Sequence, residues 1–236
     1  MTFNMWNKLL QNIKDIFFPI GCVECGMEGE WWCVNCRKKL NYNIIGSCPV
    51  CGQTTDGTVC FNCRDKSDLD GAIALFEYSE NLPVGKLIKL YKYSFVRDID
   101  SLWSDLIKQR ANNFKFRFDN SNGAVIVPVP LHARRERERG FNQAENIAKI
   151  LSEVLALPME NNFLKRIKYT SQQARLARVE RFANLQDAFV FTGVAPRQVI
   201  LVDDVFTTGA TMQSCARVLK NAGVKNVWGF TLARGQ

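Results

Sequence analysis

The sequence predicts an α/β protein in which a largely parallel sheet is flanked by helices and preceded by a small cysteine-rich module. From Gly71 onward, short apolar runs alternate with segments of helical periodicity, which is typical of such a sheet. Before that point, eight of the nine cysteines fall into four Cys-x-x-Cys pairs. The chain has 236 residues, of which 47% are hydrophobic, so it can bury the core of one full domain plus a small one.

Residues 1–20 are predicted to form an amphipathic helix that ends near Pro19, because apolar side chains recur at helical spacing on one face. The polar face is only weakly basic, which favours packing onto the rest of the protein over lying on a membrane. No apolar run approaches the ~18 residues of a transmembrane segment. Because the start also lacks the pattern of a signal peptide, we expect a cytoplasmic protein.

The cysteine pairs of residues 21–66 predict a double zinc ribbon with two structural zinc ions. Reduced thiols in the cytoplasm favour metal binding over disulfides, and tetrahedral zinc takes four thiolates. The tandem repeat favours one zinc on the first two pairs and another on the last two, although alternate pairs sharing a metal remain possible. The expected ligands are Cys22, Cys25, Cys33 and Cys36 for one ion, and Cys48, Cys51, Cys60 and Cys63 for the other.

The two halves of this module read as an internal duplication. Each half begins with Cys-x-x-Cys-Gly, and the gaps to the following pair are of similar length. A glycine after the second cysteine lets the backbone turn back so that amides point at sulfur. Since four protein thiolates leave no open coordination position, the metals should be structural rather than catalytic. The module is expected to stabilise the fold or dock a partner, while nucleic-acid binding, which its near-neutral charge disfavours, remains an alternative. The ninth cysteine, Cys215, is expected to be a small core residue.

Residues 71–236 are predicted to form one domain whose strands and helices alternate. The expected strands are 72–78, 124–129, 163–164, 189–191, 199–202 and 227–232, and the expected helices are 84–93, 102–110, 141–155 and 212–222. The net charge of the chain is +8, yet residues 1–70 hold seven basic and eight acidic side chains. The basic excess therefore lies wholly in this domain, where it would attract nucleic acid or phosphorylated small molecules.

One segment of the domain, V-I-L-V-D-D-V-F-T-T-G-A-T at 199–211, cannot be explained by packing alone. It runs from a buried strand into two adjacent acids, and then into a loop of threonines and glycine that leads into a helix. Such a loop offers amides and hydroxyls to one phosphate. The acids would repel phosphate but accept hydrogen bonds from sugar hydroxyls, or hold Mg²⁺. The pattern predicts a site for a ribose 5-phosphate.

This segment resembles the phosphoribosyl pyrophosphate motif of type I phosphoribosyltransferases. The resemblance implies a type I phosphoribosyltransferase-like parallel sheet and Mg²⁺ bound together with phosphoribosyl pyrophosphate. It assigns the ribose hydroxyls to the catalytic pair Asp203 and Asp204. It also implies that the 5-phosphate is bound by the residues that follow, Val205, Thr207, Thr208, Gly209, Ala210 and Thr211.

A second segment, V-P-V-P-L-H-A-R-R-E-R-E-R-G-F-N-Q at 127–143, follows another buried strand and fits as the other half of the site. Family members carry a pyrophosphate-binding loop at the corresponding place. His132, Arg134, Arg135 and Arg139 are therefore candidates for binding pyrophosphate or another polyanion. His132 is the only histidine, and no carboxylate or nucleophile at a recognisable spacing makes it a catalytic base.

The whole layout resembles the ComF family of bacterial competence proteins. The resemblance is carried by the Cys-x-x-Cys pairs, K-Y at 92–93, V-P-V-P-L-H and R-G-F-N-Q-A at 127–132 and 139–144, T-S-Q-Q-A-R-L-A-R-V-E-R-F-A-N at 170–184 and the acid–threonine motif. It implies a part in natural transformation, handling incoming single-stranded DNA, with a ComF-type helicase and other DNA-uptake proteins as possible partners. Six basic residues between Lys165 and Arg181, including Lys168 and Arg175, could follow a phosphate backbone.

Three functions remain open from the sequence. The first is a DNA-uptake protein whose pocket binds ribose-phosphate-like ligands, DNA or a regulatory nucleotide. The second is an active Mg²⁺-dependent phosphoribosyltransferase, for which no acceptor base can be read. Its catalysis would come from positioning and electrostatic stabilisation of the leaving pyrophosphate. The third is a zinc-ribbon adaptor with a degenerate pocket, against which the intact motif argues.

Overall fold

The computed structural model describes residues 20–39, 45–93, 99–115, 118, 123–169 and 187–235, and every statement below refers to these residues. The predicted N-terminal helix lies outside them except for its last residue, Ile20. Arg175 and most of the basic segment that contains it also lie outside the described residues. No helix within the described ranges combines the length and apolar character needed to cross a bilayer.

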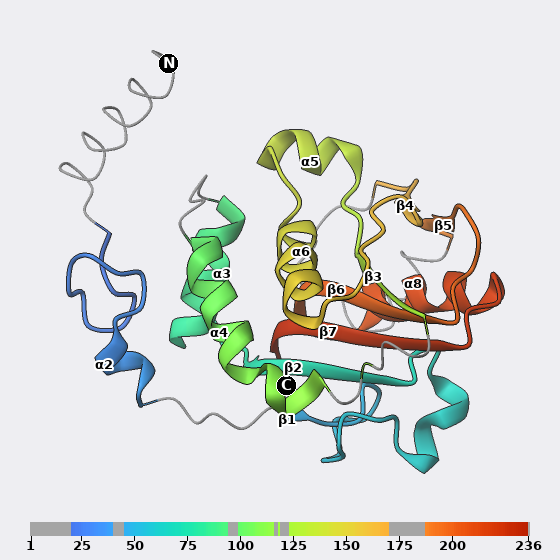
Figure 1. Cartoon of the computed structure of the whole chain (residues 1–236), viewed down its shortest axis with the longest axis horizontal. Coiled ribbons are helices and arrows are strands. Elements are labelled where there is room, and N and C mark those ends of the chain that lie inside the picture. Colours follow the sequence, from blue (N-terminus) through green and yellow to red (C-terminus); the bar gives the residue numbers. More distant parts are fainter. Residues whose placement is uncertain are drawn as a thin grey trace.

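The centre of the molecule is a five-stranded sheet with the order β1-β2-β7-β6-β3 (Figure 1). Its last four members run parallel to one another, and the short β1 joins β2 in the antiparallel sense. The strands are β1 (Ile45–Gly46), β2 (Gly71–Glu77), β3 (Ala124–Pro128), β6 (Gln198–Phe206) and β7 (Asn226–Arg234). The predicted parallel α/β sheet is thus confirmed.

Helices cover both faces of this sheet. One face packs against α3 (Pro83–Tyr93), α4 (Ile99–Phe114) and α6 (Gln143–Leu155), and the other packs against α8 (Ala210–Asn221). Along β6, Ile200 and Val202 enter the first core while Val199 and Leu201 enter the second. Successive side chains of a strand point to opposite faces, so a strand segment covered on both sides is predominantly apolar. This explains the unbroken run Val199–Val202.

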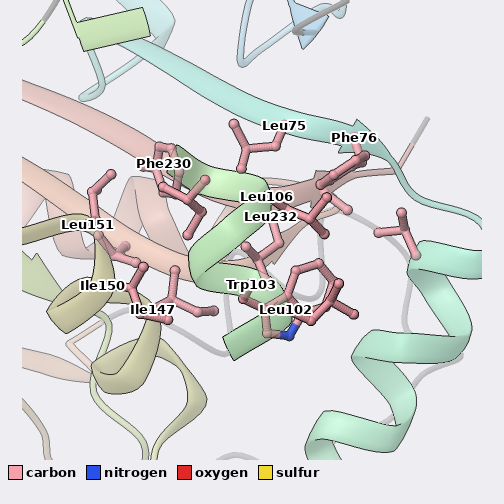
Figure 2. Packing of buried hydrophobic residues seen from close by; sticks show 14 of the residues in the cluster. Leu75, Phe76, Leu102, Trp103, Leu106, Ile147, Ile150, Leu151, Phe230 and Leu232 are labelled. Atoms are coloured by element: carbon pink, nitrogen blue, oxygen red, sulfur yellow. The ribbon is translucent and has the colours of Figure 1, made fainter. Parts of the chain in front are cut away.

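The larger core is formed by aromatic and branched side chains from α4, α6 and the sheet (Figure 2). Trp103 and Leu106 of α4 lie against Phe230 and Leu232 of β7, with Ile147 of α6 close by. Each such side chain, when fully buried, contributes roughly 1.5–3 kcal/mol to stability by leaving water.

The predicted helix 102–110 is longer than expected because its apolar face continues to Phe114. Cys215 is fully buried in the smaller core, as expected, and burial raises its pKa well above the ordinary value.

Four elements depart most clearly from the predicted pattern or lie apart from the main sheet. β6 continues four residues past Val202, because Thr231, Ala233 and Arg234 of β7 pair with it to its end. The basic segment expected as a loop contains a short helix, α5 (Ala133–Arg139). The two short predicted strands appear as β4 (Leu164–Arg166) and β5 (Phe189–Phe191), which pair with each other as a separate antiparallel sheet.

The cysteine-rich module adds only short elements before the domain, α2 (Val34–Arg37) and the 3₁₀ helix η1 (Phe61–Lys66). Its first half packs through Trp32, whose ring centroid lies 6.2 Å from that of Phe76 on β2. Its second half attaches through β1 and through hydrogen bonds to the start of β2, including Ala72 N–H to Gly57 C=O at 2.8 Å. Both halves therefore contact the domain directly.

Candidate functional site

The two segments singled out from the sequence leave adjacent strands at one edge of the sheet. Pro128 of β3 is the register partner of Val202 of β6, and Val129 N–H donates to Val202 C=O at 2.8 Å. From this point β6 continues to the acid pair, while the chain after β3 leads into α5. Parallel sheets bind ligands beyond the carboxyl ends of their strands, which makes this edge the candidate site.

The acid pair lies in the last part of β6 rather than after it. The Asp204 side chain is buried and its Oδ2 lies 2.7 Å from Lys92 Nζ. Asp203 is half-buried, and its Oδ1 accepts a hydrogen bond from the Asp204 amide at 2.9 Å. One carboxylate is therefore neutralised inside the protein, and the other lies closer to solvent.

Lys92 was missed as a site residue when only the sequence was available. It projects from the last turn of α3. Burial lowers its pKa, but the negative charges of Asp204 and Asp203 together more than offset burial, so the net shift is upward. It is a permanent cation at neutral pH. The only sequence signal was the K-Y pair in the family resemblance, since an ion pair between α3 and β6 cannot be read from spacing.

The pKa of the Asp203 carboxyl group is shifted upward. Burial raises the pKa of Asp203 to about 7, and the negative charge of Asp204 adds to this effect. Lys92 and Arg166 act in the opposite direction without cancelling the rise. At neutral pH this carboxyl group therefore exchanges a proton readily, and a bound cation or sugar hydroxyl would determine its charge.

The threonine loop, Thr207–Gly209, connects β6 to α8. Gly209 caps the helix with φ +75°, a left-handed conformation that side chains other than glycine adopt at a cost. A Cβ atom at this position would also lie 2.6 Å from the Phe206 ring. The first amides of a helix have no acceptor within the helix and attract anions. The Ala210 amide donates to Thr208 Oγ1 at 3.4 Å. The loop and the first turn of α8 present further backbone donors and threonine hydroxyls, with Thr207 exposed and Thr208 and Thr211 half-buried.

The remaining residues assigned to the phosphate, Val205 and Ala210, have no polar side chain to offer. Val205 is half-buried near the end of β6, and Ala210 is a buried residue that begins α8. Their contribution to a ligand site would come from the backbone and from the space that their small side chains leave.

On the other side of the site, His132 begins α5. Its Nδ1 accepts a hydrogen bond from the Arg134 amide at 3.2 Å, so the ring acts as the helix cap. The His132 and Tyr169 rings meet edge to face at 5.1 Å, and the Arg134 guanidinium lies 4.9 Å from the centre of the Tyr169 ring. Arg134 Nε also lies 3.0 Å from Glu138 Oε1. These contacts give an exposed cationic and aromatic surface.

A chain of hydrogen bonds links α5 to the helix that carries Lys92. Arg139 Nη1 donates to Gln143 Oε1 at 3.2 Å, and Gln143 Nε2 donates to the carbonyl of Tyr91 at 3.4 Å. The Tyr91 hydroxyl in turn donates to Asp100, which also accepts from Asn146. Arg139 is thus positioned from α6 and α3 rather than left on a free loop.

Arg166 of β4 is a second residue that sequence reasoning did not place in the site. Burial lowers its pKa and the charge of Arg135 lowers it further, whereas Asp203 acts in the opposite direction. The Arg166 guanidinium is therefore influenced both by Arg135 and by Asp203, the less buried acid. Lys168 is exposed, and its Nζ lies 3.8 Å from Asp187 Oδ2.

The sulfur atoms of the module gather into two clusters that follow the tandem pairing. In each cluster the four sulfur atoms lie within 4.8 Å of one another, and the clusters are Cys22, Cys25, Cys33, Cys36 and Cys48, Cys51, Cys60, Cys63. The duplication is visible in the backbone as well. Gly26 and Gly52 have φ of +76° and +77°, and their amides donate to the carbonyls of Cys22 and Cys48.

The chemistry of each cluster fits a divalent metal. Burial opposes ionisation of Cys22, but backbone donors including the Cys33 amide outweigh it and lower its pKa to about 6. The pKa of Cys48 is about 6 for the equivalent reason. Burial and the neighbouring sulfurs raise the pKa of Cys63 to about 12, and that of Cys36 also rises. Four crowded sulfurs therefore resist full ionisation unless a cation offsets their charge, and tetrahedral zinc takes such a set.

Comparisons with known proteins agree with this architecture. Residues 139–235 match the family described as phosphoribosyl transferase domain. The chain is 31% identical over 232 residues to Competence protein F of Haemophilus influenzae, covering 92% of this chain and 98% of that protein. It is 29% identical over 217 residues to Competence protein ComFC of Bacillus subtilis, covering 86% and 83%. It is also 29% identical over 220 residues to the DNA utilization protein YhgH of Escherichia coli K12, covering 86% and 96%.

Proposed function

Because this chain belongs to the ComF family of competence proteins, we propose that it acts in natural transformation and binds a ribose 5-phosphate ligand at the end of β6. The observation that carries the proposal is the placement of the acid pair directly before the glycine-capped start of α8. Asp203 would accept hydrogen bonds from the ribose diol, while the amides after Thr207 would bind the 5-phosphate.

Lys92 makes this arrangement compatible with an anionic ligand. Two ionised carboxylates next to a phosphate would repel it, and the effect is strong where solvent is excluded. The ion pair with Lys92 neutralises Asp204, and the raised pKa of Asp203 reduces the charge of the second acid in the ligand-free protein. Mg²⁺ prefers carboxylate and phosphate oxygens, so Asp203 and Asp204 would hold it beside a bound pyrophosphate, whose charge it would offset.

We further propose that α5 and the adjacent Tyr169 bind single-stranded DNA. α5 carries four arginines against two glutamates, and the Tyr169 side chain is exposed next to Arg134 and His132. Cationic side chains bind a phosphate backbone, and aromatic rings stack on unpaired bases without reading their sequence. The chemistry of this surface therefore suits a strand of any sequence.

The DNA proposal is tested by fluorescence anisotropy with a labelled oligonucleotide over a range of salt concentrations. The double variant Arg134→Gln/Arg137→Gln should reduce the slope of log affinity against log salt by about 1.4, because each lost phosphate contact on a single strand removes about 0.7. The variant Lys108→Gln/Lys149→Gln makes the same change in charge at exposed positions of α4 and α6. A flat salt dependence of the wild type, or equal losses in both variants, would contradict the proposal.

A second candidate function is phosphoribosyl transfer itself, favoured by Arg166, whose ionisation is influenced by both Arg135 and Asp203. In that reaction the bond from the ribose C1 to pyrophosphate breaks and an acceptor nitrogen bonds to C1. The arginines would hold the leaving pyrophosphate, and no protein nucleophile is needed. Incubation with Mg²⁺, phosphoribosyl pyrophosphate and a panel of bases should then release pyrophosphate, and Asp203→Asn should abolish the release. If the protein binds phosphoribosyl pyrophosphate but releases no pyrophosphate with any base, phosphoribosyl transfer is contradicted and the first proposal, ligand binding without transfer, is supported.

Zinc in both cysteine clusters, a cytoplasmic location and a helicase partner complete the proposal. Reduced thiols are needed for the clusters to bind metal, and the cytoplasm keeps thiols reduced.

The names of the relatives, Competence protein F and DNA utilization protein YhgH, support a role with DNA. Copurification with a ComF-type helicase from a transformable cell would test the partner.

A further inference from the structure

We propose that the second cysteine cluster, Cys48, Cys51, Cys60 and Cys63, buttresses the loop Thr207–Gly209, so that loss of its metal loosens this loop. The cluster would then be part of the ligand site and not only a fold-stabilising or docking module. The part of this inference that concerns ligand affinity rests on the proposed ribose-phosphate function.

The first connection is made by Arg234, the last residue of β7. Its Nη1 donates to the carbonyl of Ser47 at 3.0 Å, and its Nη2 donates to the carbonyl of Cys48 at 2.8 Å. Cys48 is a member of the second cluster. The same guanidinium lies 4.8 Å from the centre of the Phe206 ring. One planar group therefore contacts the backbone at the start of the second cysteine cluster and the last residue of β6.

Phe206 transmits this contact to the loop. Phe206 is buried, and its backbone carbonyl accepts from the Gly235 amide at 2.9 Å. Its ring lies so close beneath Gly209 that a Cβ atom there would approach it to 2.6 Å. The left-handed turn at Gly209 is thus packed directly on the ring that Arg234 covers.

A second connection reaches the other flank of the loop from the segment that follows Cys63. On α8, Gln213 Oε1 accepts from the Asp68 amide at 2.8 Å, and Gln213 Nε2 donates to Ser67 Oγ at 2.9 Å. The backbone N–H of Gln213 donates to the Gly209 carbonyl at 2.8 Å. The Gln213 side chain is buried, and its two hydrogen bonds to Ser67 and Asp68 are partly buried.

The first cluster attaches to other parts of the domain, although the two halves of the module are duplicates. Trp32 packs on Phe76 of β2, and Lys86 of α3 donates to the Val23 carbonyl at 3.3 Å. These contacts run to β2 and α3 and not to residues 206–213. The duplication therefore provides a matched control: Cys25 and Cys51 are equivalent, exposed members of the two clusters.

Metal loss should make the backbone of the loop less ordered, rather than change the charge near it. Without a cation, four crowded thiols separate, and the backbone around Cys48 and after Cys63 loses its fixed geometry. The amides of the loop would then populate several arrangements, and a phosphate would have to order them on binding. Such ordering lowers affinity without removing any contact of the bound state.

The test compares full-length Cys51→Ser, Cys25→Ser and Arg234→Met by amide hydrogen exchange and by calorimetric titration with Mg²⁺–phosphoribosyl pyrophosphate. Cys51→Ser should speed exchange of the amides of 207–212 roughly tenfold and weaken binding roughly tenfold. Cys25→Ser should leave both within twofold of wild type. Arg234→Met should reproduce the effect of Cys51→Ser while keeping two metal ions per chain.

Equal exchange at 207–212 in Cys51→Ser and Cys25→Ser would overturn the inference, as would an unchanged loop in Arg234→Met. Hydrogen exchange of the buried β3 amides reports whether each variant is folded. If Cys51→Ser does not fold, the result for Arg234→Met decides the test. If the wild type does not bind phosphoribosyl pyrophosphate, the proposed function fails, and the exchange measurement still tests the buttress.

Discussion

Lys92 Nζ lies 2.7 Å from Oδ2 of Asp204, joining the end of α3 to the end of β6. Both side chains are mostly buried, with 21% and 11% exposed. The charges of Lys92 and Asp204 both act on the ionisation of Asp203, because Asp203 is the residue adjacent to Asp204 in the chain.

Replacing Lys92 by methionine should destabilise the protein by about 3 kcal/mol, because it leaves the Asp204 carboxylate buried without its partner. Urea unfolding measures this change. Lys89→Met, at an exposed position of the same helix, should have little effect. In a double-mutant cycle, adding Asp204→Asn to Lys92→Met should recover much of the loss, and full additivity of the two changes would contradict the pairing.

The ionisation of Asp203 should make the stability of the ligand-free protein depend on pH. Its pKa is about 7 in the folded protein against an ordinary value of 3.8. Between these values the folded protein holds a proton that the unfolded chain has released, so the stability contribution of Asp203 falls as pH rises. Above about 7 the loss is complete. Asp203→Asn, which cannot ionise, should therefore gain stability relative to wild type as pH increases from 4 to 8.

This pH prediction is checked by urea unfolding of wild type and Asp203→Asn at several pH values without Mg²⁺. The difference between the two proteins isolates Asp203 from other titrating groups. A stability difference that is constant across the range would show that the carboxyl group ionises normally.

Gly209→Ala should cost more stability than an ordinary glycine substitution at a left-handed position. The left-handed conformation alone costs an alanine roughly 1–2 kcal/mol, and the new methyl group would also displace the Phe206 ring. Gly123→Ala is the matched control, since Gly123 has φ +64° with no atom within 4 Å of a Cβ. Urea unfolding should show a larger loss at Gly209, and equal losses would mean that the ring yields freely.

Metal analysis of the purified protein should return two zinc ions per chain. Cys25→Ser and Cys51→Ser should each lower this to one, because the two clusters are separate sets of four sulfurs. Inductively coupled plasma mass spectrometry of protein dialysed against metal-free buffer provides the number. One zinc in the wild type, or loss of both ions from a single substitution, would contradict independent sites.

The fold was predictable from the sequence because local patterns determine it. The buried run Val199–Val202 and the helical periodicity of α6 each identify their own element. The cysteine spacing likewise contains the duplication, which appears again in the φ angles of Gly26 and Gly52. Such signals depend on neighbouring residues in the chain.

The parts that were missed depend on contacts between distant segments. β6 extends to Phe206 only because β7 pairs with it there, and the basic run folds into α5 once His132 caps it. Lys92, Arg166 and Arg234 reach the site from three different strands and helices. No spacing rule in the sequence relates them to Asp203, Asp204 or Gly209.

The most direct test of the central claim is calorimetric titration of the wild-type protein with Mg²⁺–phosphoribosyl pyrophosphate, alongside Thr208→Val. The wild type should bind one ligand per chain. The variant should bind at least about tenfold more weakly, since a hydrogen bond to a charged group contributes about 1.5–3 kcal/mol. Thr192→Val, whose hydroxyl instead contacts Asn162, should bind as the wild type does. No binding by the wild type, or unchanged binding by Thr208→Val, would contradict the account.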